Sequence, residues 1–314
     1  MDIKSPIRLA PAFAERIWGG RKLVTDFNKK CNIEKIGESW ELSTHKDGSS
    51  IISGGEFDGM LFSDFIGQYA SHVLGKNALK FDYFPILIKF IDANDSLSVQ
   101  VHPNDEYAKI HEGEYGKTEM WYILDCEEGA SIYYGFKHEI TKDEFLKRIA
   151  DNTLTEVLNR VNVKKGDVYF IESGTVHAIN AGIVICEIQQ NSNTTYRVYD
   201  YGRIDKNGNA RELHIEKAAD VSTLAPAKPQ TVFSDPETLA ECDYFTVKKA
   251  AVEGARSFSV SDDCFCSVIV TDGSGTLSMN GKELSLNKGD SIFIPAQDGE
   301  FSVKGKCELI LSCV

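Results

Sequence analysis

Short runs of β-branched and aromatic residues, separated by Gly, Asn and Asp, make up most of the 314-residue chain. Branched and aromatic side chains fit a pleated surface and the separating residues favour turns, so these runs are typical of β-strands joined by turns. In residues 97–102 the apolar positions 97, 99 and 101 share one face of a predicted strand, and Ser98, Gln100 and His102 share the other. The pattern predicts a mainly β protein.

Helical patterns are confined to two places. Ser63 is positioned to cap a helix that stops at Gly75. Thr141 and Thr153 are each followed three residues later by Glu, which predicts two consecutive capped helices. These helices interrupt the series of strands and do not alternate with it. That order excludes a doubly wound α/β sheet and favours a sandwich or barrel with a helical insertion at about 139–161.

Two stretches of the chain are similar to each other, at 163–178 (VKKGDVYFIESGTVHA) and 286–297 (LNKGDSIFIPAQ). Each places a Lys-Gly-Asp turn before a strand, which predicts two copies of one barrel unit. The polar, proline-bearing segment 220–237 is the predicted connector between them. We therefore expect one domain over 1–228 and a second over 229–314.

The net charge of -13 argues against nucleic-acid binding, because phosphate backbones require clustered Lys and Arg. The chain has no window of about 18 apolar residues, and its first residues lack a basic stretch followed by an apolar run. We therefore expect neither membrane insertion nor secretion. The eight cysteines include no C-x-x-C pair, so we expect reduced thiols in a cytoplasmic protein, with Cys264 and Cys266 buried for structural reasons.

Side chains that can bind a metal occur in three of the predicted strand regions. Gln100 and His102 lie on the polar face described above. Glu119, in GKTEMWYIL, shares a face with Trp121, and His177 lies in a short turn between two apolar strands. A carboxylate between apolar side chains is costly to bury unless a positive group pairs with it. One amide, two imidazoles and one carboxylate are ligands that zinc accepts, and two histidines with a carboxylate also suit iron. The other histidines lie in predicted helices or polar loops, where we expect solvated side chains: His45, His72, His111, His138 and His214.

Several motifs resemble known proteins. The cupin signature G-x5-P-x-G-x2-H matches Gly166, Gly174 and His177, with Glu172 where proline is usual. The segments QVHPNDEYA, GKTEMWYI, ESGTVHAI and QQNSNTTYRVYDYGR closely resemble the type I mannose-6-phosphate isomerases in their short bacterial form, and the resemblance extends to AERIWGGRKL and GESWELS. It implies two cupin-type, jelly-roll β-barrels, of which the first is catalytic.

The resemblance also implies one zinc ion per chain. Carried over by motif, its ligands are Gln100, His102, Glu119 and His177. The second repeat reads AQDG where the first has its histidine, so we expect no metal in the carboxy-terminal domain.

The implied activity is the interconversion of D-mannose 6-phosphate and D-fructose 6-phosphate through an enediol intermediate. Negative charge builds on oxygen in that transition state, and a Lewis-acidic zinc and a fixed guanidinium are suited to stabilise it. The resemblance marks Arg197, in the T-x-R segment, as catalytic. The identity of the base stays open between a zinc-bound water, Glu187 and Asp200.

For substrate binding we select Lys117, which lies at the site in the resembling family, together with Lys89 and Glu187. Lys89 interrupts the apolar run PILIKFIDA, where it is either a lysine reaching solvent at a sheet edge or one facing the substrate. Lys117 is the first choice for the phosphate group, ahead of Lys89, Arg197 and Arg203.

Two other functions fit the same motifs. A metal-dependent cupin dioxygenase would use two histidines and a carboxylate for iron. A non-catalytic sugar-binding cupin would keep the barrel but lack a ligand or the arginine. Arg197 and Lys117 beside the ligands favour the isomerase. The expected partner is a small-molecule sugar phosphate, and the sequence predicts no oligomeric state.

Overall fold

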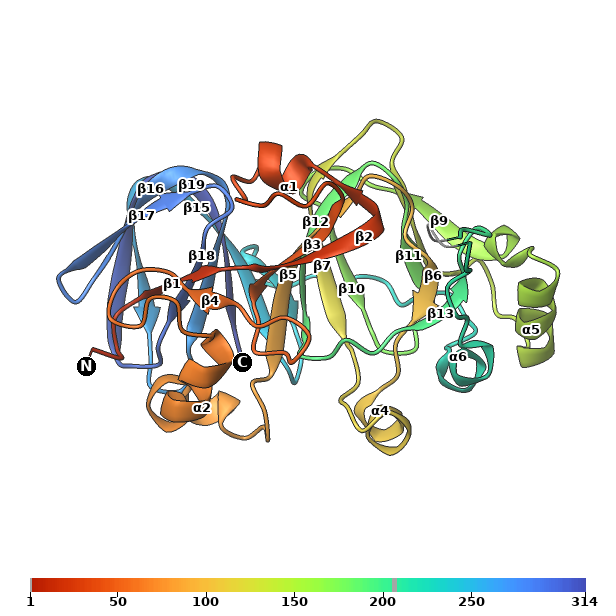
Figure 1. Ribbon diagram of the computed structural model, residues 1–314, viewed down its shortest axis with the longest axis horizontal. Helices are drawn as coiled ribbons and strands as arrows, with labels where there is room; N and C mark the ends of the chain where they lie inside the picture. Colours follow the sequence, from red (N-terminus) through yellow and green to blue (C-terminus); the bar gives the residue numbers. More distant parts are fainter. Residues whose placement is uncertain (1, 205–207) are drawn as a thin grey trace.

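The alternating patterns form three antiparallel sheets in the computed structural model, which describes residues 2–204 and 208–314 (Figure 1). The prediction of a mainly β protein is confirmed. Each sheet is an open path of hydrogen-bonded strands. The finer description as two barrels therefore remains a prediction.

The first sheet combines strands from both ends of the chain. Its order is β14-β15-β19-β16-β18-β1-β4, with β17 paired to β16. The red strand β1 lies beside the blue carboxy-terminal strands in Figure 1, and Ile7 pairs with Phe293. The division at residues 228 and 229 remains a prediction. The strands of this sheet are β1 (Ile7–Ala10), β4 (Ile51–Ile52), β14 (Thr238–Glu241), β15 (Thr246–Val260), β16 (Cys266–Met279), β17 (Lys282–Asn287), β18 (Ser291–Ile294) and β19 (Gly299–Cys313).

The second sheet, of six strands, lies in the middle of the molecule. Its order is β10-β7-β12-β5-β2-β3. Apolar side chains cover both of its faces: Phe90 packs in one cluster with Phe293 of the first sheet, and Ile91 packs in a separate cluster with Ile132 of the third. Burial on both faces explains the continuous apolar runs in this part of the sequence. The strands are β2 (Ala12–Gly20), β3 (Ile36–Leu42), β5 (Ile86–Ala93), β7 (Glu119–Cys126), β10 (Val168–Ile171) and β12 (Ile183–Gln190).

The third sheet, of five strands, packs with one face against the second sheet. Ile179 belongs to the cluster between the two sheets, whereas Val99 and Ala178 face outward into a cluster with Phe145 of α5. Because side chains alternate along a strand, the polar positions next to Val99 face inward. Leu97 precedes β6 and packs in the inner cluster, so its predicted place beside Val99 is wrong. The order is β13-β6-β11-β8-β9, with β6 (Val99–Val101), β8 (Ser131–Phe136), β9 (Leu158–Asn162), β11 (His177–Ile179) and β13 (Tyr196–Tyr199).

The helices lie at the periphery of the sheets (Figure 1). The Thr141 side chain accepts a hydrogen bond from the Glu144 N–H at the start of α5, as predicted. Helix α2 starts at Phe62 without a side-chain cap, so the predicted Ser63 cap is wrong. The helices are α1 (Lys22–Thr25), α2 (Phe62–Val73), α3 (Gly75–Ala78), α4 (Asp105–His111), α5 (Lys142–Ala150) and α6 (Ile215–Val221).

The predicted helix after Thr153 is wrong. Only a single 3₁₀ turn forms, at Leu154–Glu156, and the chain then enters β9, where Val161 pairs with Ile132 of β8. Sheet pairing therefore overrides the local capping pattern. Within the described residues, no helix is long and apolar enough to span a membrane.

Candidate metal centre

Two rows of side chains line the space between the second and third sheets. On the third sheet, Arg197 of β13 lies opposite Gln100 of β6, and Gln100 lies opposite His177 of β11. On the second sheet, Lys89 of β5 lies between Trp40 of β3 and Glu187 of β12. Pairing across strands thus gathers residues that are distant in the sequence.

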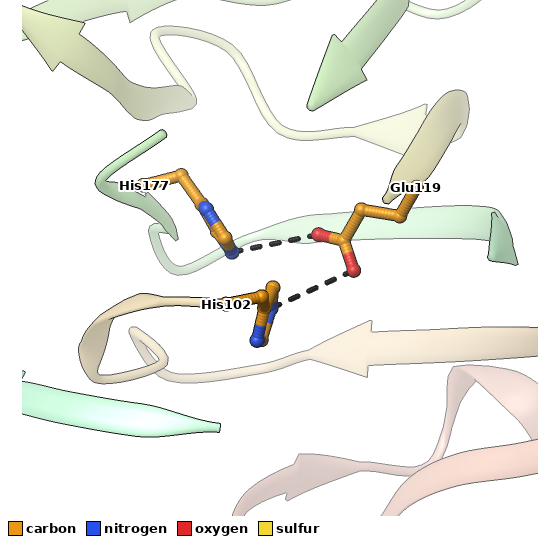
Figure 2. A group of neighbouring side chains, drawn as sticks. All are labelled: His102, Glu119 and His177. Atoms are coloured by element: carbon orange, nitrogen blue, oxygen red, sulfur yellow. Dashed lines mark ion pairs between the residues drawn. The ribbon is translucent and has the colours of Figure 1, made fainter. Parts of the chain in front are cut away.

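Three side chains from separate segments meet at one end of this space. His102 follows β6, Glu119 opens β7 and His177 opens β11. His177 Nε2 lies 3.4 Å from Glu119 Oε1, and His102 Nε2 lies 3.6 Å from Glu119 Oε2 (Figure 2). All three residues are at most 1% exposed. The sequence prediction that these residues converge is therefore met by the geometry, and His177 begins a strand where a turn was expected.

Backbone carbonyls orient both imidazoles. His102 Nδ1 lies 2.9 Å from the Thr194 carbonyl oxygen, and His177 Nδ1 lies 2.8 Å from that of Thr175. A carbonyl only accepts, so each Nδ1 carries the hydrogen and each Nε2 presents a lone pair to Glu119. Burial lowers the pKa of His177 to about 4 and that of His102 well below its ordinary value. Both rings are neutral near pH 7.

This arrangement fits a metal ion. Glu119 Oε1 has no hydrogen-bond partner among the described residues, and Oε2 is paired only with the Lys117 ammonium group. Lys117 pairs with one carboxylate oxygen, but the His177 lone pair and Glu119 Oε1 still face each other without a positive group between them, which a shared metal ion would supply. All three residues offer ligand atoms within 4.8 Å of one another, and the donor set suits zinc or iron. Across residues 2–204 and 208–314, no other group of His, Cys, Asp and Glu side chains has this geometry.

Gln100 lies beside the three side chains. Its Nε2 is 3.4 Å from His177 Nε2. The two amide orientations differ only in which atom faces the site, and turning the amide would present Oε1. Its role as a metal ligand stays a prediction.

Lys117 supplies a buried positive charge to this end of the space. Its Nζ lies 2.7 Å from Glu119 Oε2, 3.3 Å from His102 Nε2 and 3.7 Å from Glu187 Oε1. Burial alone would lower the pKa of Lys117, but the carboxylates of Glu119 and Glu187 raise it. The ammonium group is charged and is held by carboxylates.

A second chain of charges continues from Glu187. Lys89 Nζ lies 3.7 Å from Glu187 Oε1, 3.8 Å from Glu38 Oε2 and 4.7 Å from the centre of the Trp40 ring. Burial would raise the pKa of Glu38, but Lys89, Arg16 and Trp40 lower it to about 2. Burial lowers the pKa of Lys89, and burial followed by the charge of Glu119 raises that of Glu187. Lys89 is only 4% exposed and so is not a solvent-reaching edge lysine.

Arg197 lines a cavity of about 480 Å³ that opens beside the candidate metal-binding side chains. Gln100, Lys117 and Glu187 line the same cavity. The Arg197 Nε donates to Ser98 Oγ over 3.2 Å, and its Nη1 donates to the Glu212 carbonyl over 2.9 Å. The cavity therefore places the Arg197 guanidinium near Gln100 and Lys117, which in turn contact His177 and Glu119.

Asp200 was a candidate base from the sequence, and Arg203 was a candidate for phosphate binding. The two side chains form an ion pair with each other. Asp200 accepts hydrogen bonds from Arg203 and Arg211. Burial would raise the pKa of Asp200, but these two arginines lower it. Neither Asp200 nor Arg203 is among the residues that line the cavity.

Sequence reasoning missed three residues of the site. Glu38 alternates with Trp40 in GESWEL, the pattern that singled out Glu119 beside Trp121, so a signal was present. Arg16, whose Nε lies 2.9 Å from Glu38 Oε1, belongs to the segment AERIWGGRKL that resembles the family, so a signal was present there too. His214 was expected to be solvated, but its Nδ1 accepts the Arg197 backbone N–H over 3.2 Å.

The solvated state predicted for His45 is also wrong, because its ring is buried against Trp40.

Comparison with known proteins gives a consistent result along the chain. Residues 7–131 match the family described as phosphomannose isomerase type I, catalytic domain. Residues 235–314 match the family described as mannose-6-phosphate isomerase, cupin domain.

Individual relatives match over nearly the full length. The mannose-6-phosphate isomerase ManA of Bacillus subtilis is 42% identical, with 98% of both chains covered. A mannose-6-phosphate isomerase of Streptococcus mutans is 37% identical, again with 98% of both chains covered. The crystal structure of a mannose 6-phosphate isomerase from B. subtilis has a TM-score of 0.90 at 38% identity, covering 99% of this chain and 100% of that chain.

Proposed function

The chain belongs to the type I mannose-6-phosphate isomerase family, and we propose that it interconverts D-mannose 6-phosphate and D-fructose 6-phosphate through an enediol, with one zinc ion per chain. Membership of this family makes the protein an isomerase. The observation that carries the proposal is the convergence of two imidazole lone pairs and the Glu119 carboxylate beside a cavity lined by Arg197.

His102, Glu119 and His177 would hold the zinc, with Gln100 as the fourth ligand once its amide is turned. When bound, the zinc supplies a Lewis acid that polarises oxygen atoms of the sugar. The carbonyls of Thr194 and Thr175 keep the two rings in the tautomer that binds a metal.

The ion-paired charges around the site favour an anion once a divalent metal is present. Lys89, Lys117 and Arg16 contribute three positive charges and Glu38, Glu119 and Glu187 three negative charges, so the sum is zero without a metal. A divalent ion brings the sum to about +2, and this positive charge stabilises both a phosphorylated substrate and an enediolate oxygen. Arg197 adds a guanidinium that cannot lose its charge at neutral pH.

Glu187 is better suited than Asp200 to move the proton between C1 and C2. Its Oε1 has no hydrogen-bond partner among the described residues, and its raised pKa brings it closer to neutral pH, where a general base is most effective. Asp200 is held by two arginines that lower its pKa. Lys117 and Lys89, on either side of Glu187, would contact the hydroxyl groups of the sugar.

The proposed activity also suggests the partner, the cellular location and the role of each domain. The partner is a small-molecule sugar phosphate, and the enzyme acts in carbohydrate metabolism in the cytoplasm, where its eight free cysteines stay reduced. We assign the catalytic domain to 1–228 and a cupin-like domain without a metal to 229–314.

Metal analysis tests the zinc proposal. Purified protein should contain about one zinc per chain, lose activity on chelation, and recover it with zinc better than with ferrous iron. His102→Ala should abolish high-affinity zinc binding, whereas His72→Ala, on the exposed surface of α2, should not. Full activity after complete metal removal would overturn the proposal.

A further inference from the structure

Three guanidinium groups line the cavity beside the candidate metal-binding side chains. Arg16 from β2, Arg197 from β13 and Arg211 from the segment after β13 all line it. Burial and then the charges of Arg211, Arg203 and Arg16 lower the pKa of Arg197. This concentration of arginines contrasts with the chain's net charge of -13.

The two lysines of the cavity are poor anchors for a phosphate group. Lys117 Nζ is 2.7 Å from Glu119 Oε2, and Lys89 lies between Glu38 and Glu187. Both lysines are at most 5% exposed. A phosphate dianion placed there would face three buried carboxylates at close range, which costs free energy.

Arg211 and Arg16 use only some of their N–H groups in hydrogen bonds to the protein. Arg211 uses Nε and Nη2 to bind Asp200, and Arg16 uses Nε for Glu38 and Nη1 for the Glu15 carbonyl. No hydrogen bond from Arg211 Nη1 or Arg16 Nη2 is found within the described parts of the chain. The partner carboxylates hold each guanidinium plane in place, which leaves its remaining N–H groups oriented for a ligand.

The spacing of the two ends suits a six-carbon sugar phosphate. Arg16 ends a chain of ion pairs that starts at Glu119 and runs through Lys117, Glu187, Lys89 and Glu38, so it lies several side chains away from the metal end. The phosphate on C6 is at the opposite end of the substrate from the reacting carbons C1 and C2. With C1 and C2 at the metal, the phosphate reaches the arginines.

On the basis of the proposed isomerase function, we infer that Arg211 and Arg16 bind the substrate's phosphate group, whereas Lys89 and Lys117 serve the sugar end. This assignment replaces the lysines as the phosphate anchors expected from the sequence.

The test compares substrates with and without the phosphate. In Arg211→Gln and Arg16→Gln, kcat/KM for mannose 6-phosphate should fall at least tenfold more than kcat/KM for unphosphorylated mannose, mainly through KM. Arg256→Gln, which removes an ion pair with Glu237 in the carboxy-terminal sheet, is the control. Equal losses on both substrates, or no loss on mannose 6-phosphate, would overturn the inference.

Direct binding separates this inference from the proposed function. Inorganic phosphate should bind the zinc-loaded wild-type protein at least tenfold more tightly than either Gln variant in calorimetry, even if the wild type forms no fructose 6-phosphate. Arg211→Lys and Arg16→Lys, which keep the charge, should retain part of the affinity. Unchanged phosphate binding in folded Gln variants would reject the assignment, whereas a wild type inactive on mannose 6-phosphate would reject the function alone.

Discussion

The ammonium nitrogen of Lys117 lies 2.7 Å from Glu119 Oε2, so a buried lysine is the counter-charge of the carboxylate that faces both imidazoles. The same nitrogen lies 3.3 Å from His102 Nε2, a lone pair that a metal would take. Lys117 and a metal ion therefore stabilise the same carboxylate and repel each other.

Lys117→Met tests this relationship. Without its counter-charge the metal-free protein should lose about 3 kcal/mol of unfolding free energy, because a buried carboxylate is left unpaired. Zinc affinity should rise about tenfold, because no cation then competes for Glu119, and kcat should fall. Urea unfolding in the presence of a chelator and zinc titration against a chromophoric chelator measure the two effects. Lys109→Met, on the exposed side of α4, is the control, and weaker zinc binding at unchanged stability would contradict the account.

His214 positions the backbone of Arg197. Its Nδ1 accepts the Arg197 N–H over 3.2 Å, and the Arg197 carbonyl accepts the His214 N–H over 2.8 Å. His214→Ala removes the side-chain acceptor. One net hydrogen bond contributes ~1 kcal/mol, which corresponds to about a fivefold change in rate, so kcat should fall by about that factor. His214→Asn offers an oxygen in place of Nδ1 and should recover most of the activity. Equal activity of the Ala and wild-type proteins would show that the contact has no role.

The same contact predicts a pH dependence. Burial is the main cause of the lowered pKa of His214. The charges of Arg197 and Lys217 lower it further, whereas those of Glu212 and Glu112 partly offset this by raising it. The ring is therefore neutral at pH 7, and protonation removes its acceptor only below pH 6.5. The wild-type kcat should contain a component that falls there, and the profile of His214→Asn should lack it. Identical profiles would exclude this role for the histidine.

Glu38 should contribute to acid stability. Burial raises its pKa, but Lys89, Arg16 and Trp40 lower it from 4.5 to about 2, which corresponds to roughly 3 kcal/mol. Because the pKa of Glu38 is lower in the folded than in the unfolded state, the ionised carboxylate stabilises the folded protein fully above pH 4.5. This stabilisation is lost as the pH falls toward 2. Urea unfolding should show wild type more stable than Glu38→Gln at pH 6, with the difference shrinking at pH 3. A constant difference would contradict the low pKa.

Lys29 and Glu41 form a buried ion pair where the second sheet meets the carboxy-terminal sheet. Lys29 Nζ lies 2.6 Å from Glu41 Oε2 and also donates to the Gly289 carbonyl. Lys29→Met alone should cost about 3 kcal/mol because it leaves the Glu41 charge buried, and Lys29→Met combined with Glu41→Leu should recover much of that loss. Denaturant unfolding of the single and double variants measures the coupling. If the losses of unfolding free energy in the single variants simply added up in the double variant, Lys29 and Glu41 would not be energetically coupled.

Local alternation predicted much of the site. Gln100 and His102 were placed on one strand face, and Glu119 was predicted to need a positive partner, which is Lys117. Period-two patterns carry such information because the side-chain direction of a strand is fixed by its backbone.

Residues that depend on pairing between distant strands could not be found in this way. Lys89 is buried because Glu38 of β3 and Glu187 of β12 flank it, and neither neighbour is visible from the run PILIKFIDA. His214 and Thr194 act through backbone contacts to segments distant in the chain. The capping pattern at Thr153 failed for the same reason, since β9 pairs with β8.

Isomerase activity can be measured by following mannose 6-phosphate with ³¹P and ¹H NMR in the presence of zinc-loaded protein. We expect conversion to an equilibrium mixture with fructose 6-phosphate, at a rate that falls at least a hundredfold in Arg197→Ala and in His102→Ala. Mannose 6-phosphate that stays unchanged beside a folded, zinc-loaded wild-type protein would contradict the proposed activity.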